Sequence, residues 1–199
     1  MKKVLLEAAL VAITGAALAF AANAFSNRGL KLTRDYFPGA KRAAIPLATT
    51  GTNAAQTAVA ATTARLREEG LQVVDSDQAL QLFHDPRFEQ GLVVFVDARN
   101  DEHYHEGHIP GAYQFDHYHP ENYLAALLPV CQVAQQIVVY CAGGDCHDSE
   151  FAALFLRDSA KISADKLSVY AGGINEWSGR GNPVETGERK SGQMRTASK

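Results

Sequence analysis

Short apolar runs alternate with helix-like stretches from residue 71 to residue 177 of this 199-residue chain. Four runs have the length and composition of buried β-strands: residues 71–74, 92–96, 137–140 and 167–170. Three stretches carry helical patterns: residues 77–83 behind a Ser76 cap, 149–157 and 174–177. This alternation predicts an α/β fold with a mostly parallel sheet and helices on both of its faces.

Cys141 directly follows the third of these strands and opens a loop that contains two glycines. Ligands of parallel sheets bind at the carboxyl ends of strands, so we expect the chemistry here. Uncovered N–H groups and the positive end of the next helix favour a thiolate, whereas Asp145 and Asp148 disfavour it. The alternative is a buried cysteine that packs as a small apolar residue. The predicted site is Cys141 as nucleophile with an active loop of Ala142, Gly143, Gly144, Asp145, Cys146, His147, Asp148 and Ser149.

The composition, 46% hydrophobic and 21% charged, is that of a globular domain, and the length allows one domain plus an extension. A net charge of −3 and scattered basic residues argue against nucleic-acid binding. Three cysteines are too few for a disulfide scaffold or a four-cysteine zinc site, and we expect Cys131 to be structural. We expect neither metal nor cofactor, because no known zinc spacing is matched by the pairs His103 and His105, His117 and His119, and Cys146 and His147.

The N-terminal residues 1–25 have a membrane-type composition. Lys2 and Lys3 precede an apolar stretch, residues 4–25, which meets the length of about 20 residues that a spanning helix needs. We expect a single-pass anchor in a bacterial-type inner membrane, with its orientation not fixed by charge. The alternatives are a signal peptide cleaved near Ala22-Asn23-Ala24, with export, and a soluble helix. The predicted organisation continues with a linker (26–70), in which residues 54–69 are expected to be helical and to end at Gly70. The folded domain (71–187) and a flexible tail (188–199) follow.

Several motifs of the folded domain resemble those of rhodanese-like domains. The early signature is carried by Val96-Asp97-Ala98-Arg99, Tyr104 and Gly107-His108-Ile109-Pro110-Gly111-Ala112. Val139-Tyr140-Cys141 is similar to the strand that leads to the family's catalytic cysteine. The closing motifs are matched by Gly172-Gly173-Ile174, Trp177 and Gly181-Asn182-Pro183-Val184. The resemblance spans about residues 71–187 and implies the rhodanese fold.

The resemblance also implies a sulfurtransferase or persulfide carrier. Cys141 would take sulfane sulfur from a small donor, such as thiosulfate, a polysulfide or a protein persulfide, and pass it to a thiol acceptor. A loop of inward-pointing N–H groups can stabilise the persulfide anion. Asp97, Arg99 and His108 are expected to support the structure rather than take part in the chemistry.

The active loop departs from the family pattern, and the loss of an arginine together with the presence of Asp145 and Asp148 argues against ordinary thiosulfate activity. The family carries an arginine directly before the serine or threonine of the helix, and here Asp148 holds that place in a longer loop. Its absence also argues against the phosphatases that share this fold, since a phosphoryl group needs such a donor. Cys146 is an addition that could resolve a Cys141 persulfide or simply pack into the domain. The rival hypotheses are therefore an inactive binding module at a membrane and a thiol–disulfide protein using Cys141 and Cys146.

Overall fold

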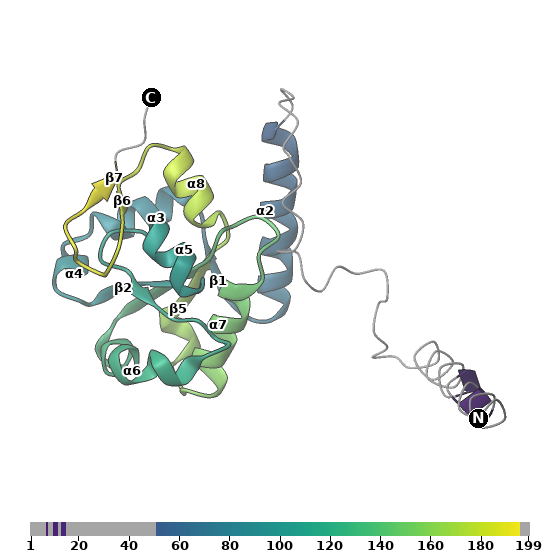
Figure 1. The fold of residues 1–199 in the computed structure, drawn as a ribbon. Helices are drawn as coiled ribbons and strands as arrows, with labels where there is room; N and C mark the ends of the chain where they lie inside the picture. The colour runs from purple at the N-terminus through teal and green to yellow at the C-terminus, as the bar shows by residue number, and fades with distance from the viewer. Residues whose placement is uncertain (1–6, 8–9, 12, 15–50, 196–199) are drawn as a thin grey trace. The chain divides into compact units, whose positions relative to one another are not determined.

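A computed structural model describes residues 7, 10–11, 13–14 and 51–195 of the chain (Figure 1). Within these residues, five strands form one sheet in the order β1-β5-β4-β2-β3, and every neighbouring pair is parallel. Its strands are β1 Gln72–Val74, β2 Val93–Asp97, β3 Tyr113–Gln114, β4 Gln136–Tyr140 and β5 Leu167–Tyr170. A separate antiparallel pair is formed by β6 Val184–Glu185 and β7 Met194–Arg195.

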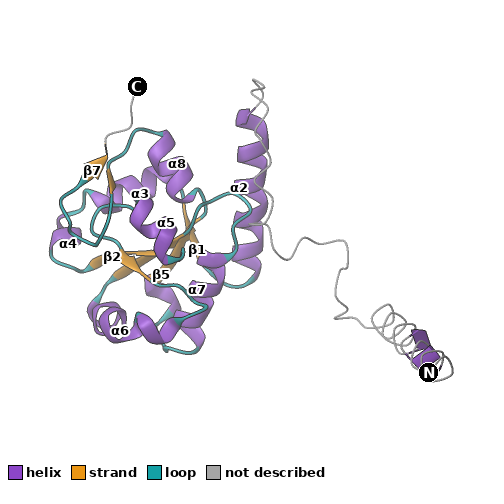
Figure 2. Ribbon diagram, viewed as in Figure 1, coloured by secondary structure: helices purple, strands orange, loops and turns teal. Residues whose placement is uncertain are grey.

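Helices cover both faces of the parallel sheet, as Figure 2 shows. One face packs against α2 Gly51–Glu68, α6 Leu124–Val133 and α7 Asp148–Asp158. The other face packs against α3 Ser76–Phe83, α4 Pro86–Glu89 and α8 Gly173–Gly179. The short helix α5 Asp101–Glu106 follows β2, and the part of the chain that the structure describes also has 3₁₀ turns at Pro120–Asn122 and Ala164–Lys166.

Alternate side chains of each central strand enter opposite cores. In β2, Val94 and Val96 pack on the α6 and α7 side, whereas Val93 and Phe95 pack on the α3 and α8 side. The strands are buried on both faces, which is why they read as continuous apolar runs rather than as alternating ones. The predicted α/β class and parallel sheet are therefore confirmed.

Element boundaries differ slightly from the predicted ones. The cap of α3 is Asp75 rather than Ser76, because the Asp75 carboxylate accepts from the Gln78 N–H while the Gln78 side chain accepts from the Asp75 N–H. Two short elements between β2 and β4, the helix α5 and the strand β3, were not predicted, because segments this short show no clear hydrophobic periodicity. The same segment also contains α6, which holds Pro129 in its interior, a residue that usually ends a helix.

Both ends of the predicted domain differ from the structure. The helix expected at residues 54–69 of the linker is α2, Gly51–Glu68, and Gly70 follows it with a φ of +74°. Its Leu66 is fully buried in the core, so α2 belongs to the folded domain rather than to a linker. Part of the predicted tail is ordered as well, since Met194–Arg195 forms β7 and the Arg189 guanidinium lies 3.7 Å from the centre of the Tyr113 ring. Residues 26–50 and 196–199 lie outside the described residues.

The predicted anchor or signal peptide lies almost entirely outside the described residues. Of residues 1–25, the structure describes positions 7, 10–11 and 13–14, which are helical. No helix among the residues described here is long and apolar enough to cross a membrane.

Candidate active site

The loop after β4 is held against the start of α8. The carbonyl oxygens of Cys141 and Ala142 accept the N–H groups of Ile174 and Asn175, at 2.9 and 3.2 Å. Gly143 has a φ of +94°, and a Cβ there would overlap the Gly172 carbonyl. This close approach and the left-handed backbone explain why the position requires glycine.

The same contacts direct an N–H group at the sulfur. The C=O and N–H of a trans peptide point in opposite directions, so fixing the Ala142 carbonyl toward α8 turns the Gly143 N–H away from it. That N–H donates to the Cys141 thiolate, as does the backbone N–H of Ser149 at the start of α7. The Ser149 hydroxyl adds a third hydrogen bond, with its Oγ 3.3 Å from the Cys141 Sγ.

Cys141 is 1% exposed, yet its surroundings favour the thiolate. Burial alone raises the pKa of the thiol, but hydrogen bonds from Cys146, Ser149 and the backbone outweigh it and lower the pKa to about 7. A thiol with this pKa is about half ionised at neutral pH, whereas a free cysteine has a pKa of about 8.5. The buried Cys131 is a contrast, because burial raises its pKa to about 12.

Cys146 stays a protonated thiol beside this thiolate. Its hydrogen-bond interaction with Cys141, its burial and the negative charges of Cys141 and Asp148 raise its pKa well above the ordinary value. Its Sγ also lies 3.5 Å from an Asp148 carboxylate oxygen. All three cysteines of the chain are free. The two loop cysteines are therefore joined by a hydrogen bond from the Cys146 thiol to the Cys141 thiolate and not by a disulfide.

These contacts predict the pH dependence of Cys141 reactivity. The rate of alkylation by a neutral reagent such as iodoacetamide should rise with pH to a plateau, with a midpoint near pH 7, and fall about tenfold per unit below it. Cys146→Ala removes a hydrogen-bond donor to the thiolate and should move the midpoint upward. Cys146→Ser keeps a hydrogen-bond donor, so its midpoint should lie between those of Cys146→Ala and the unaltered protein. An unchanged midpoint in Cys146→Ala would mean that the thiol does not stabilise the thiolate.

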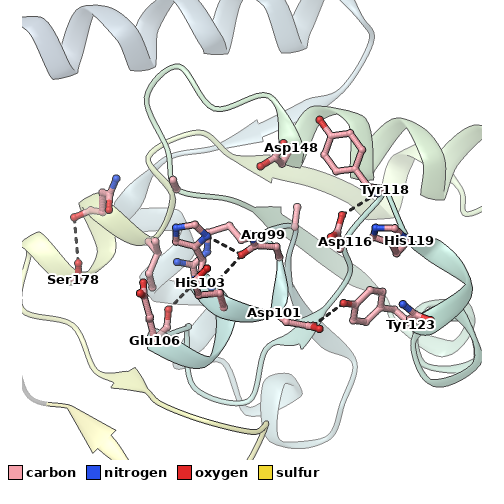
Figure 3. A pocket seen from close by; sticks show the side chains of 18 of the residues that line it. Arg99, Asp101, His103, Glu106, Asp116, Tyr118, His119, Tyr123, Asp148 and Ser178 are labelled. Atoms are coloured by element: carbon pink, nitrogen blue, oxygen red, sulfur yellow. Dashed lines mark hydrogen bonds between the residues drawn. The ribbon is translucent and has the colours of Figure 1, made fainter. Parts of the chain in front are cut away.

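A cavity of about 1170 Å³ opens beside the active loop, where Ala142 and Asp148 line it (Figure 3). Its other walls come from α5, from the segment after β3 and from the start of α8. Its charged groups are mainly acidic: five carboxylates, Asp101, Glu102, Glu106, Asp116 and Asp148, against the guanidinium groups of Arg99 and Arg195. None of the five carboxylates forms an ion pair with a lysine or arginine of residues 51–195.

Arg99 lines the cavity and interacts electrostatically with Cys141, but its guanidinium is already paired. Its guanidinium binds the fully buried Asp97 carboxylate through Nε, at 2.9 Å, and Nη2, at 2.5 Å. The same Nη2 donates to the Gly107 carbonyl at 2.6 Å. The two residues join the end of β2 to the loop after α5, an arrangement suited to the predicted supporting role.

His108 is also buried and lies away from the cavity. Its ring stacks on Tyr104 with centroids 3.9 Å apart, and its nitrogens contact the Tyr104 carbonyl, at 3.0 Å, and the Glu185 carboxylate, at 3.2 Å. Burial raises the pKa of Glu185, but backbone hydrogen bonds from Gly111, Gly192 and Lys190 and the nearby His108 lower it overall. His108 therefore links the segment after α5 to β6, and a structural role for it stays a prediction.

The remaining loop residues have different surroundings. Asp145 is exposed, and Gly144 and His147 are partly buried. The His147 ring faces the buried Glu150 carboxylate at 3.4 Å and stacks near Phe151. Around the loop lie further residues that no sequence pattern singled out: Thr62, Arg65, Asp116, Tyr118 and Glu150.

The histidines do not gather into a metal centre in the described part of the chain. No three side chains of histidine, cysteine, aspartate or glutamate there are placed to hold a metal ion. His103 instead contacts the Asn100 side chain at 2.7 Å, and His117 lies against Tyr118, with ring centroids 4.0 Å apart.

Comparisons with known proteins agree with the early resemblance. An HTH-type transcriptional regulator of Mycobacterium tuberculosis is 35% identical over 101 residues, which are 51% of this chain and 41% of the regulator. The chain thus spans about two fifths of that relative's length.

Among solved structures, a thiosulfate sulfurtransferase from Pseudomonas aeruginosa is 19% identical with a TM-score of 0.45, covering 66% of this chain and 23% of that one. A protein of unknown function from Rhodopseudomonas palustris, described as a possible tyrosine phosphatase, is 22% identical with a TM-score of 0.47, covering 71% of this chain and 100% of that one. The family described as "Rhodanese-like domain" matches residues 76–180. This chain therefore belongs to the rhodanese-like domain family.

Proposed function

We propose that this protein is a rhodanese-like sulfurtransferase or persulfide carrier that moves sulfane sulfur through Cys141. The observation that carries the proposal is a nearly inaccessible thiol whose pKa is lowered to about 7 by converging hydrogen-bond donors. A cysteine that only filled the core would have no need of these donors. Its pKa would be raised by burial alone, as that of Cys131 is.

The chemistry is a two-step transfer of one sulfur atom. The Cys141 thiolate attacks the sulfane sulfur of the donor, a Cys141–S–S⁻ persulfide forms, and the bond between that sulfur and the rest of the donor breaks with its electron pair. With thiosulfate, the leaving group is sulfite. An acceptor thiolate then attacks the outer sulfur, leaves with it as a persulfide, and regenerates the Cys141 thiolate. The N–H groups of Gly143 and Ser149 stabilise the Cys141 thiolate, which is the attacking group in the first step and the leaving group in the second.

The cavity charges favour some sulfur donors and acceptors over others. Thiosulfate is a dianion, and its approach passes carboxylates that no arginine or lysine of residues 51–195 neutralises. Two like unit charges 4 Å apart repel by about 1 kcal/mol even in water. We therefore propose that thiosulfate is a poor donor and that the acceptor is a thiol on a neutral or cationic molecule.

Intact-mass measurement of the full-length chain tests both the transfer of sulfur through Cys141 and the proposed preference among donors and acceptors. Polysulfide should add one sulfur atom to the protein. Cysteamine persulfide, which carries an ammonium group, should add it several-fold faster than the dianion thiosulfate. The loaded protein should then pass its sulfur faster to cysteamine than to 2-mercaptoethanol, and slowest to 2-mercaptoethanesulfonate, at equal thiolate concentration. The double variant Glu102→Gln with Glu106→Gln should reduce the differences in rate between the donors and between the acceptors, since both side chains line the cavity and both lose their negative charge.

Other outcomes of the same experiment would point elsewhere. Failure of every donor to add sulfur to the folded protein would support a binding module without turnover. A loss of two hydrogens, reversed by a reductant, would support a thiol–disulfide protein, which the hydrogen bond between Cys146 and Cys141 makes chemically accessible. Attachment to a membrane through residues 1–25, with a membrane as partner, stays a prediction.

A further inference from the structure

Helix α2 lies before the family match, which begins at residue 76, yet it packs against the sheet. Leu66 is fully buried in the core, and Val59 packs against that core from the preceding turns. The Leu71 N–H donates to the Leu66 carbonyl at 2.9 Å, which joins the end of α2 to the entry of β1. The position of α2 is therefore set by the folded domain.

Thr62 connects this helix to the active loop. Its hydroxyl donates to the Gly144 carbonyl at 2.7 Å, and the residue is only 3% exposed. A threonine inside a helix commonly bonds its own helix backbone, so a bond to a loop 82 residues away is a tertiary contact. Because the Gly144 carbonyl is held toward α2, the following N–H, that of Asp145, points away from α2.

Little else holds the loop at this point. A Cβ built on Gly144 would meet no atom within 4 Å, and Gly144 has a φ of +66°. A cavity of about 490 Å³ separates the loop from α2, lined by Val59, Ala60, Gly143 and Gly144 among others. The Thr62 hydroxyl therefore supplies a restraint that packing does not.

A second contact from α2 reaches the helix that follows the loop. The Arg65 Nε lies 2.6 Å from a carboxylate oxygen of Glu150, which is 6% exposed in the first turn of α7. The same oxygen faces the His147 ring at 3.4 Å. Without Arg65, a buried negative charge near the Cys141 thiolate would lose its counter-charge. The charged and titratable groups in the loop or facing it are Arg65, Arg99, Asp116, His117, Tyr118, Asp145, Cys146, His147, Asp148 and Glu150.

We propose that α2 is part of the active site and that Thr62 and Arg65 are positioning residues for the active loop. The N-terminus of α8 holds the loop at Cys141 and Ala142, and α2 holds it at Gly144, the second of the two glycines. Together these contacts keep the Gly143 N–H aligned with the sulfur. The inference rests on the proposed function, because the positioned group is the Cys141 thiolate.

The test compares isosteric variants in the full-length chain. Thr62→Val removes the hydroxyl and keeps the shape, Thr62→Ser keeps the hydroxyl, and Thr63→Val makes the same change at the neighbouring threonine. For each, iodoacetamide alkylation of Cys141 against pH gives the midpoint, and intact mass gives the rate of sulfur loading by polysulfide. Thermal unfolding shows which variants are folded.

Thr62→Val should raise the alkylation midpoint by about half a unit to one unit and slow loading about three- to tenfold at pH 7. Thr62→Ser should behave much like the unaltered protein, and Thr63→Val should leave both quantities unchanged. If Thr62→Val does not fold, Arg65→Gln, compared with Arg67→Gln on the exposed face, carries the same expectation of a raised midpoint.

An unchanged midpoint in folded Thr62→Val, or equal shifts in Thr62→Val and Thr63→Val, would overturn the positioning role while leaving sulfur loading intact. Equal shifts of the alkylation midpoint in Arg65→Gln and Arg67→Gln would likewise overturn the positioning role. Absence of loading in the unaltered protein would refute the proposed function instead. The alkylation midpoints would still decide whether α2 positions the loop.

Discussion

Cys141→Ser should abolish sulfur loading at neutral pH. A serine hydroxyl ionises far above this range and cannot hold a sulfane sulfur, so the persulfide cannot form. The expected result is an intact mass that does not change with polysulfide, whereas the unaltered protein gains one sulfur atom. Cys131→Ala should load normally, because Cys131 is fully buried and burial keeps its pKa at about 12.

The coupling between the two loop cysteines requires one more control. The negative charge of Cys141 contributes to the raised pKa of Cys146, so its removal makes Cys146 easier to ionise. Slow residual loading of Cys141→Ser that disappears in Cys141→Ser with Cys146→Ser would come from this substitute thiolate. Peptide mapping that finds the sulfur on Cys146 in the unaltered protein would contradict the assignment of the nucleophile.

Arg99→Leu should destabilise the fold by about 3–5 kcal/mol, the cost of breaking a buried ion pair at one partner. The Asp97 carboxylate is fully buried at the end of β2 and takes two hydrogen bonds from the Arg99 side chain. Leucine fills part of the space and keeps the backbone N–H that donates to Asp97 at 3.1 Å, but it leaves the buried carboxylate without a counter-charge. Urea unfolding followed by fluorescence of Trp177, which is buried in the core, measures the loss.

The chain contains a matched control for this substitution. Arg87 binds Asp85 with the same spacing of two residues and the same two-pronged geometry, but both residues lie at the surface. Arg87→Leu should therefore change the free energy of unfolding very little. Asp97→Asn added to Arg99→Leu should recover part of the loss, since it removes the unpaired charge. Equal effects of Arg99→Leu and Arg87→Leu would mean that burial does not set the strength of the Asp97–Arg99 pair.

The sequence by itself determined the fold class and identified Cys141 as the candidate nucleophile. The central strands are buried on both faces, so each one is a continuous apolar run that stands out from its polar neighbours. Cys141 was recognised because strand, cysteine, glycines and helix follow one another along the chain. Local order of this kind is visible in a sequence because the interacting residues are neighbours.

The tertiary structure alone decided what surrounds that nucleophile. The predicted linker contains α2, whose Thr62 meets Gly144 across 82 residues of sequence, and the alanine-rich composition of this helix carries no sign of the contact. The acidic cavity likewise combines carboxylates from α5, from the segment after β3 and from the start of α7. Each of these groups looks like an ordinary surface residue in the sequence, because contacts between distant segments are set by how the sheet and helices pack.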